Sequence, residues 1–135
     1  SLYSSGPASA VGTVTSAALV SNTTVTGNSF VLNGNVASTS TTGAVTLDIF
    51  DKTLYRTAHY FVQVTDNTNS QYHSEQVMLI HDGTTVYKTE YNLVYSAALL
   101  GTFDASIAGN QVSLTFTASA ATNKTIKLLR TSINI

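Results

Sequence analysis

The chain has 135 residues, a length that fits one domain, and 43% of them are hydrophobic, which is enough for a packed core. Charged residues make up only 10%, and the formal net charge of −1 supplies no positive field for a phosphate backbone, which excludes a general nucleic-acid binder. The absence of cysteine excludes disulfides, thiol catalysis and iron–sulfur clusters, and no apolar run or basic-then-apolar start indicates a membrane helix or a signal peptide.

The charges are distributed unevenly along the chain. No Asp, Glu, Lys, Arg or His occurs before Asp48, and only Tyr3 and Phe30 among the aromatic residues precede it. So few large side chains bury too little surface to offset the ordering of that segment. We therefore divide the chain into 1–47, an uncharged Ser/Thr/Ala/Val-rich β segment for intersubunit or anchoring contacts, and 48–135, an antiparallel β-sandwich.

Nearly every element that the pattern predicts is a strand. β-branched and aromatic runs, separated by Ser, Asn, Asp and Gly, follow one another at intervals of about 10–15 residues. Asn33-Gly34 and Asp82-Gly83 each predict a tight hairpin turn, and one helical turn is expected at 96–100. In chain order the expected strands are 11–20, 30–32, 35–36, 44–50, 54–65, 72–80, 85–95, 101–107, 112–117 and 126–135.

Alternation within these strands predicts the buried face. In 54–65 one side of the strand carries apolar residues and the other carries mainly polar ones, and the same pattern recurs in 112–117. Short strands of this spacing, with turn signals between them, favour an all-β fold, an antiparallel β-sandwich of the jelly-roll type. The residues expected to point inward are Ala58, Tyr60, Val62, Val64, Val112, Leu114 and Phe116.

Four stretches of the second part carry a linked series of motifs. They are YRTAHYFVQVTD (55–66), EQVMLIHDGTTVYKTEYNLVYS (75–96), LLGTFDASIAGNQVSLTF (99–116) and TIKLLRTSINI (125–135). In this order they resemble the C-terminal β domain of virion structural proteins from T4-like tailed phages, many of them phages of cyanobacteria. The resemblance implies a component of a tail fibre, neck, baseplate or head decoration.

The expected role follows from that resemblance and from the low charge. A surface of hydroxyls and amides repels other copies only weakly, which suits a protein that packs in a fixed assembly. We expect a virion protein that forms a homo-oligomer, with a trimer favoured, and contacts other virion proteins. The same interpretation gives it no catalytic role, cofactor or metal, and no nucleic-acid or membrane partner. The alternative is a tail-fibre domain that binds a host receptor or glycan.

Two local patterns resemble metal or catalytic motifs. His73-x-Glu75 together with His81 has the composition of a two-histidine, one-carboxylate iron site. Six residues of strand separate Glu75 from His81 by about 20 Å, however, which is too far for a shared metal. His81 beside Asp82 suggests a catalytic dyad, but the Asp-Gly pair is already explained by the hairpin turn.

Glu75 and Glu90 are the remaining candidate pair. They stand seven steps on either side of Asp82-Gly83, so the hairpin brings them close enough to face each other. Two carboxyls a few ångströms apart are the usual arrangement for glycoside cleavage, and direct opposition would raise the pKa of one of them. The competing interpretation is that each charge meets Lys88 or Arg56.

Tyrosines recur on one predicted strand. Tyr87, Tyr91 and Tyr95 fall on one face of 85–95. Such a face is usually core, and the alternative is a ligand-stacking platform for a sugar. The solvent exposure of the three rings distinguishes the two.

Overall fold

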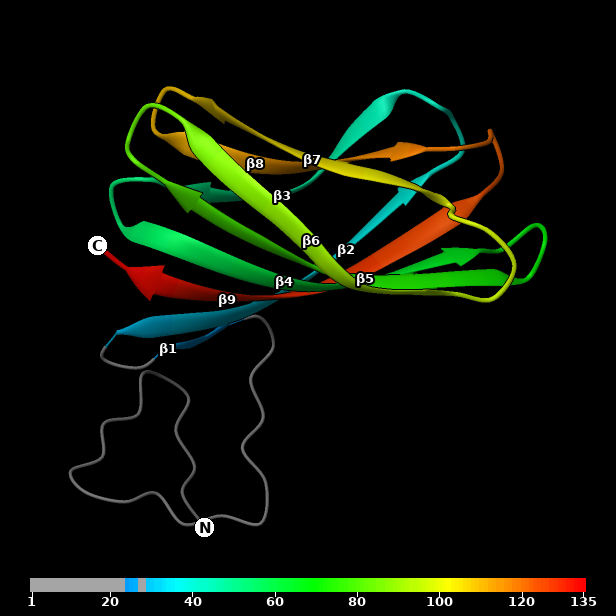
Figure 1. Ribbon diagram of the computed structural model, residues 1–135, viewed down its shortest axis with the longest axis horizontal. Helices are drawn as coiled ribbons and strands as arrows, with labels where there is room; N and C mark the ends of the chain where they lie inside the picture. Colours follow the sequence, from blue (N-terminus) through cyan, green and yellow to red (C-terminus); the bar gives the residue numbers. More distant parts are fainter. Residues whose placement is uncertain (1–23, 27–28) are drawn as a thin grey trace, which may run out of the picture.

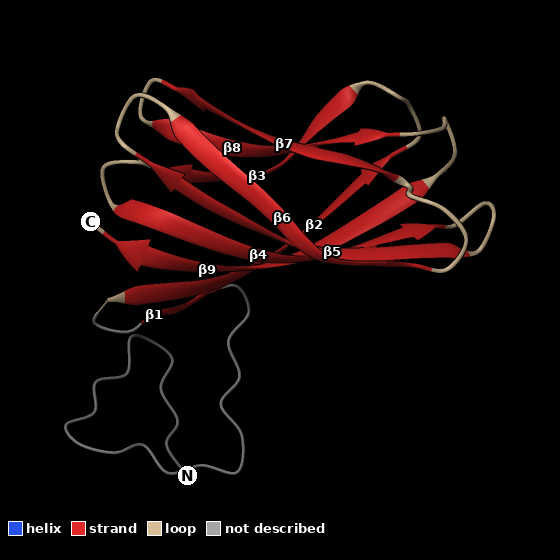
Figure 2. Cartoon of the chain, in the orientation of Figure 1, coloured by secondary structure: helices blue, strands red, loops and turns tan. Residues whose placement is uncertain are grey.

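The computed structural model describes residues 24–26 and 29–135, and nine strands run through them (Figure 1). In chain order they are β1 (Thr24–Thr26), β2 (Phe30–Thr39), β3 (Ala44–Asp51), β4 (Tyr55–Asp66), β5 (Gln71–His81), β6 (Val86–Tyr95), β7 (Gly101–Ala108), β8 (Gln111–Ala118) and β9 (Lys124–Asn134). Figure 2 shows strands and loops in the described part, so the helical turn predicted at 96–100 is wrong. Within that part, no helix has the length and hydropathy to cross a bilayer. The strand predicted at 11–20 lies outside the described residues.

Two antiparallel sheets pack face to face. The larger sheet has the strand order β1-β2-β9-β4-β5-β6, and the smaller has the order β3-β8-β7. Figure 1 shows the smaller sheet above the larger one, with the two layers joined by short loops. The predicted antiparallel β-sandwich is therefore confirmed.

The core lies between the sheets and follows the alternation of the strands. The residues expected to point inward from β4 and β8 are all fully buried. Phe103 of β7 packs against Phe116 of β8 with ring centroids 5.1 Å apart. The sequence pattern thus predicts the inner faces correctly wherever a strand runs without interruption.

A buried ion pair joins the two sheets. Arg130 of β9 donates from Nη1 to Asp48 Oδ2 of β3 at 2.6 Å, and the Tyr60 hydroxyl donates to the same oxygen at 3.0 Å. The Arg130 guanidinium also lies 5.6 Å from the centre of the Phe50 ring. Because a buried charge without its partner is strongly unfavourable, this cluster holds the sheets in one register.

The turn predicted at Asn33-Gly34 is wrong. Both residues lie inside β2, which pairs with β9 without a break from one end to the other. Gly34 stands opposite Leu129 and does not adopt the positive φ that a two-residue hairpin turn requires. A continuous ladder of inter-strand hydrogen bonds outweighs the local preference of the dipeptide.

The division of the chain at Leu47/Asp48 falls inside β3. Residues 29–47 therefore include strands of both sheets rather than a separate layer, because β2 pairs with β9 and β3 pairs with β8.

The hairpin predicted at Asp82-Gly83 is confirmed: Asp82 Oδ1 accepts the backbone N–H groups of Thr84 and Thr85, and Gly83 has a φ of 100°.

Candidate functional site

The pairing of β5 with β6 contains a β-bulge. From the hairpin the two strands run in register as far as Gln76–Tyr91, and beyond the shift Ser74 pairs with Val94. Two residues of β6, Asn92 and Leu93, therefore stand opposite the single residue Glu75. Asn92 has a φ of 57°, in the left-handed region that asparagine tolerates better than most residues.

The bulge changes the side to which the end of β6 points. Tyr87 and Tyr91 lie on the outer face of the large sheet, whereas Tyr95 pairs with His73 and points to the inner side. The prediction that the three tyrosines share one face is therefore wrong for Tyr95. Tyr87 and Tyr95 are about half exposed, and the Tyr91 ring stacks on His59 with centroids 6.1 Å apart. A ligand-stacking role for these rings stays a prediction.

A pocket of about 290 Å³ lies at the bulge, on the open edge of the sandwich between β6 and β7. We call it the bulge pocket. Glu75 is buried at its wall, and Glu90 is exposed. Lys88 Nζ lies 3.2 Å from Glu90 Oε2 and donates to the Phe103 carbonyl at 2.6 Å, which ties β6 to β7. The pocket is lined by Glu75, Glu90, Tyr91, Asn92, Leu93, Leu99, Gly101 and Thr102.

The two glutamates are offset along the hairpin. Glu90 stands opposite Val77 rather than Glu75, because His81 pairs with Val86 and the turn between them has four residues. The predicted direct opposition is wrong by two positions, and diagonal neighbours of this kind have Cα atoms about 7–8 Å apart. Burial and, to a smaller extent, the negative charge of Glu90 raise the pKa of the Glu75 carboxyl to about 7 against the opposing effect of Lys88.

His73 lies next to Glu75 inside the sandwich and is 1% exposed. Its Nδ1 accepts the backbone N–H of Leu100 at 3.3 Å, so the ring proton is on Nε2. Nε2 lies 3.5 Å from Glu75 Oε1 and finds no hydrogen-bond partner among the described residues. Because burial lowers the pKa of His73, the ring is neutral near pH 7 and presents an unused N–H donor to the carboxyl.

The histidines and the carboxyl of the predicted metal motif have separate partners. His73, Glu75 and His81 do lie on the same face of β5. His81 is engaged elsewhere, with Nε2 2.6 Å from the Tyr55 carbonyl oxygen and Nδ1 accepting the N–H of Gly83. In the part of the chain that the structure describes, no three His, Asp or Glu residues are grouped so that they could hold a metal ion.

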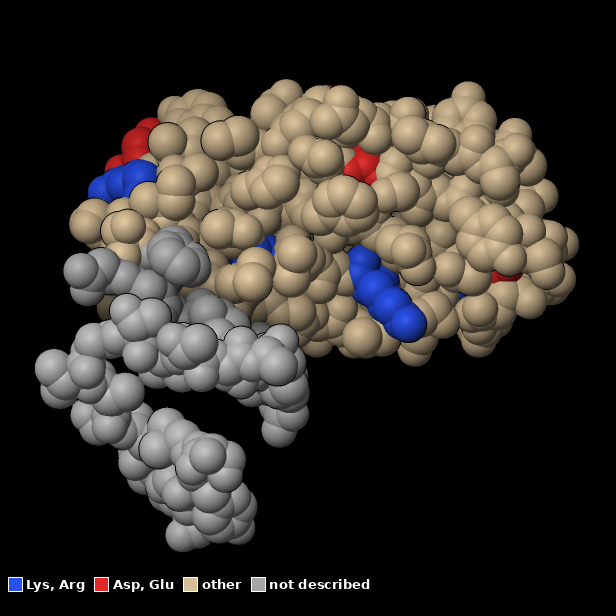
Figure 3. Space-filling model, turned by 90° about the horizontal axis from the view of Figure 1, so that it is seen from below, with Lys and Arg blue, Asp and Glu red and all other residues tan. Residues whose placement is uncertain are grey.

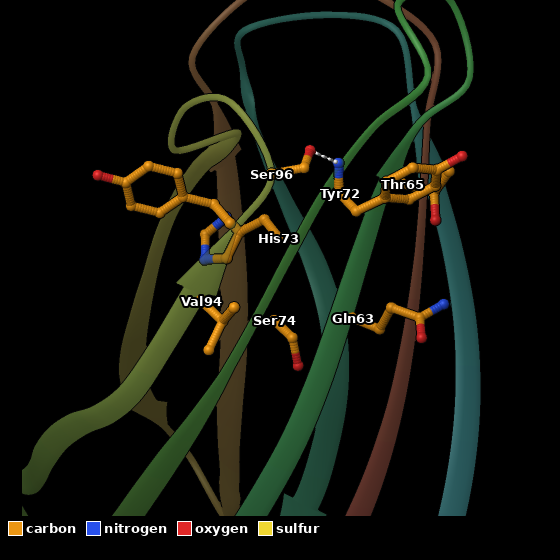
Figure 4. A pocket seen from close by; sticks show the side chains of 8 residues that line it. Gln63, Thr65, Tyr72, His73, Ser74, Val94 and Ser96 are labelled. Atoms are coloured by element: carbon orange, nitrogen blue, oxygen red, sulfur yellow. Dashed lines mark hydrogen bonds between the residues drawn. The ribbon is translucent and has the colours of Figure 1, made fainter.

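A second hollow, of about 510 Å³, lies beside the bulge where β4 and β6 end and β5 begins (Figure 4). Its lining contains hydroxyl, amide and imidazole groups but no carboxylate, ammonium or guanidinium among the described residues. Tyr72 donates its backbone N–H to Ser96 Oγ at 3.0 Å, the bond drawn in Figure 4. His73 lines this hollow and also contacts Glu75 of the bulge pocket. The lining residues are Gln63, Thr65, Tyr72, His73, Ser74, Val94, Tyr95 and Ser96.

The outer face of the large sheet is apolar over much of its area. Nine large apolar side chains on it have between 42% and 68% of their surface exposed. The register aligns them in rows, such as Leu129 beside Phe61 and Ile80 beside Tyr87. Outside its grey part, Figure 3 shows few charged side chains in the view from below. The nine are Val36, Phe61, Tyr72, Met78, Ile80, Tyr87, Val94, Leu129 and Ile133.

Sequence reasoning missed this face, although a signal for it exists. The runs VMLI (77–80) and KLLR (127–130) place apolar residues on both sides of their strands. A strand that is apolar on both faces is typical of a sheet covered on both faces. The alternation in β4 and β8 predicts only the inward apolar residues, and the outward apolar residues of β5 and β9 do not follow from it.

No protein-family model matches the chain, and no curated protein matches it. Among solved structures, the tailspike protein gp49 of Acinetobacter baumannii bacteriophage Fri1, a capsular polysaccharide depolymerase, matches 82% of this chain at 15% identity and a TM-score of 0.48. The tailspike of Acinetobacter phage vB_ApiP_P1 matches 93% at 16% identity and a TM-score of 0.48. That of A. baumannii phage AM24 matches 76% at 10% identity and a TM-score of 0.37. The chain spans only 19%, 25% and 26% of the three matched chains, in that order.

These neighbours bear on two of the expectations from sequence. All three matched structures are tailspike proteins of Acinetobacter phages, and the T4-like, cyanophage-type origin implied by the resemblance stays a prediction. The expectation that the protein has no catalytic role is corrected, because the matched Fri1 tailspike is described as a depolymerase.

Proposed function

We propose that the chain is a domain of a phage tail protein that assembles with copies of itself through the outer face of its six-stranded sheet. The observation that carries the proposal is the apolar outer face. With about half of each large side chain exposed, nine of them present on the order of 800 Å² of apolar surface. Summed over the face, that area is close to the surface of roughly 800 Å² that one partner buries in a standard interface.

The charges on this face also favour contact between identical copies. The register places Lys127 on the outer side of β9 and His59 on the outer side of β4, among hydroxyl, amide and apolar neighbours. A surface with so few like charges lets two copies approach without strong electrostatic repulsion. We expect a homotrimer at the virion tail in which the uncharged segment 1–47 adds intersubunit contacts, β2 contributing Val36 from the sheet's outer face.

The test measures the mass of the 135-residue chain in solution. We expect a trimer by sedimentation velocity, and we expect Phe61→Lys, a charge placed between Leu129 and Gln76 on the outer face, to give monomers. The matched control is Ile49→Lys. Ile49 is 45% exposed, close to the 50% of Phe61, but it lies on the outer side of the small sheet.

Two results would contradict the proposal. One is a wild-type chain that stays monomeric at high concentration, which would favour the glycan-binding alternative for the exposed face. The other is a dissociation of the oligomer by Ile49→Lys that is as strong as that caused by Phe61→Lys. Unchanged far-ultraviolet circular dichroism spectra of both variants would show that the substitutions act on assembly rather than on the fold, since loss of assembly by itself shifts thermal unfolding.

A further inference from the structure

The bulge pocket combines features that a purely structural strand edge does not need. A buried carboxyl, Glu75, and an exposed carboxylate, Glu90, line the same pocket. The bulge that opens it holds Asn92 at a φ of 57°. Independently, the buried His73 directs an unpartnered Nε2–H toward Glu75 from 3.5 Å. Backbone strain and an unused buried donor are concentrated at functional sites.

The two carboxyls differ in their surroundings. Glu75 keeps 8% of its side-chain surface exposed, whereas Glu90 keeps 35% and has the Lys88 ammonium 3.2 Å away. The buried group is therefore favoured in its protonated form and the exposed one in its ionised form. An acid and a base set by their environments in this way are the two groups that general acid–base catalysis uses.

The spacing selects among reactions that two carboxyls perform. Carboxyls that share one proton, as in peptide hydrolysis by an aspartyl pair, lie about 3 Å apart. The register makes Glu75 and Glu90 diagonal neighbours on the inner face, with Cα atoms about 7–8 Å apart, rather than a directly opposed pair of the kind that shares one proton. Among the described residues, no serine lines the pocket, and no three His, Asp or Glu residues are grouped so that they could hold a metal ion there.

We propose that the bulge pocket hydrolyses glycosidic bonds, with Glu75 as the proton donor and Glu90 as the base that activates water. The bridging oxygen takes the Glu75 proton as its bond to the anomeric carbon breaks. The oxygen of a water molecule bonds to that carbon while Glu90 takes the water's proton. One water is consumed and two hydroxyl-ended products leave, and exchange of one proton with solvent restores both carboxyls.

The remaining groups position the pair. His73 Nε2–H faces Oε1 of Glu75, which leaves Oε2 as the oxygen that carries the acid proton. The Lys88 ammonium lies 3.2 Å from Glu90 Oε2 and, through its hydrogen bond to the Phe103 carbonyl, holds β6 beside β7. The β7 residues at the pocket, Gly101 and Thr102, are uncharged, so His73, Glu90 and Lys88 are the titratable groups that act on Glu75 from the surrounding strands.

The experiment uses two kinds of glycoside on the full 135-residue chain. The sugars are glucose, galactose and N-acetylhexosamines in both anomers, attached either to 2,4-dinitrophenol, which leaves without protonation, or to benzyl alcohol, which needs a proton. We expect Glu75→Gln to lower kcat on benzyl glycosides about 100-fold or more while changing the dinitrophenyl reaction less than about 10-fold. Glu90→Gln lowers kcat on both kinds of glycoside. The control Asp104→Asn, at an exposed carboxyl, lowers kcat on neither.

The contrast between leaving groups separates chemistry from folding, because a misfolded variant loses both reactions equally. The proposal is overturned if the wild type hydrolyses none of these glycosides faster than the Glu75→Gln/Glu90→Gln double variant does. Equal loss of both reactions in Glu75→Gln overturns it as well. Both single variants keep the wild-type sedimentation behaviour, so failure here is distinguishable from failure of the self-assembly proposal.

Discussion

The two sides of β5 differ in a single feature of their pairing. Toward β4, pairs follow one another without interruption from Thr57–Ile80 to Asp66–Gln71. Toward β6, the same strand meets one extra residue, and the pairing shifts after Gln76–Tyr91. The uninterrupted side preserves alternation and builds the core. On the bulged side, Tyr95 points inward, and a pocket opens beside a buried acid.

The strands that contribute most to stability and the strand that carries the candidate site therefore lie in different parts of the sheet. The central strands β4 and β8, whose inward residues are mostly apolar, contribute much of the buried surface, and their neighbours cannot move independently. The edge strand β6 is exposed along most of its length, so a bulge there disturbs little of the core. Changes on the β4–β9 side should therefore lower stability more than changes at the bulge.

The largest effect is expected from Arg130→Ala in the regular part of the sheet. Removal of the guanidinium leaves Asp48 buried without its partner, and we expect the free energy of unfolding to fall by about 3–5 kcal/mol in urea denaturation. The control is the double variant Asp48→Asn/Arg130→Met, which removes both charges and should recover much of the loss. A loss below about 1 kcal/mol for Arg130→Ala would contradict the comparison.

An intermediate, pH-dependent effect is expected at Glu75. Since its pKa is about 7 in the folded protein and 4.5 as the reference value, the folded state binds more protons in that interval. The contribution of Glu75 is complete below pH 4.5 and declines as the pH rises to 7, by on the order of 3 kcal/mol in total. The measurement is urea denaturation at several pH values, with Glu75→Gln as the reference that lacks this slope.

The two proteins differ only in the carboxyl at position 75, so the difference between their stability curves reports on its ionisation. Parallel stability curves for the two proteins between pH 4.5 and 7 would mean that Glu75 titrates near its ordinary pKa. That result would also remove the acid that the glycosidase proposal requires.

The smallest effect is expected from the backbone of the bulge itself. Asn92→Val places a β-branched residue at a φ of 57° and should cost about 1–2 kcal/mol. Asn92→Gly, which accepts this conformation freely, should stay within about 0.5 kcal/mol of wild type. Thermal unfolding of the two variants provides the measurement. Equal stability of the Asn92→Val and Asn92→Gly variants would show that β6 can lose the bulge without a loss of stability.

Much of the fold could be predicted from local pattern. Alternation in β4 and β8 identifies the inward residues, and Asp82-Gly83 identifies the hairpin, because both signals act over a few neighbouring residues. Asn33-Gly34 misleads for the same reason: its turn preference is local, whereas β9, almost 100 residues away in the chain, decides that the segment stays extended.

The candidate site was predicted only in part. Glu75 and Glu90 were identified as a pair, but the expected rise of one pKa depended on direct opposition, which the register does not give; burial is the main cause that raises the pKa of Glu75. The offset of the pair depends on the length of the turn, and the inward direction of Tyr95 depends on the bulge. The sequence pattern predicts neither the offset of the two glutamates nor the inward direction of Tyr95, since Asn92 is compatible with a regular strand position as well as with a turn.

The sequence by itself determined that this protein is built from antiparallel strands around an inner face of alternating apolar residues, because a period of two is a property of each strand alone. The tertiary structure decided which strands pair, where β6 gains its extra residue, and that Glu75 is buried within reach of His73 and Glu90. Those features depend on contacts between segments far apart in the chain, whose free energy exceeds any local preference.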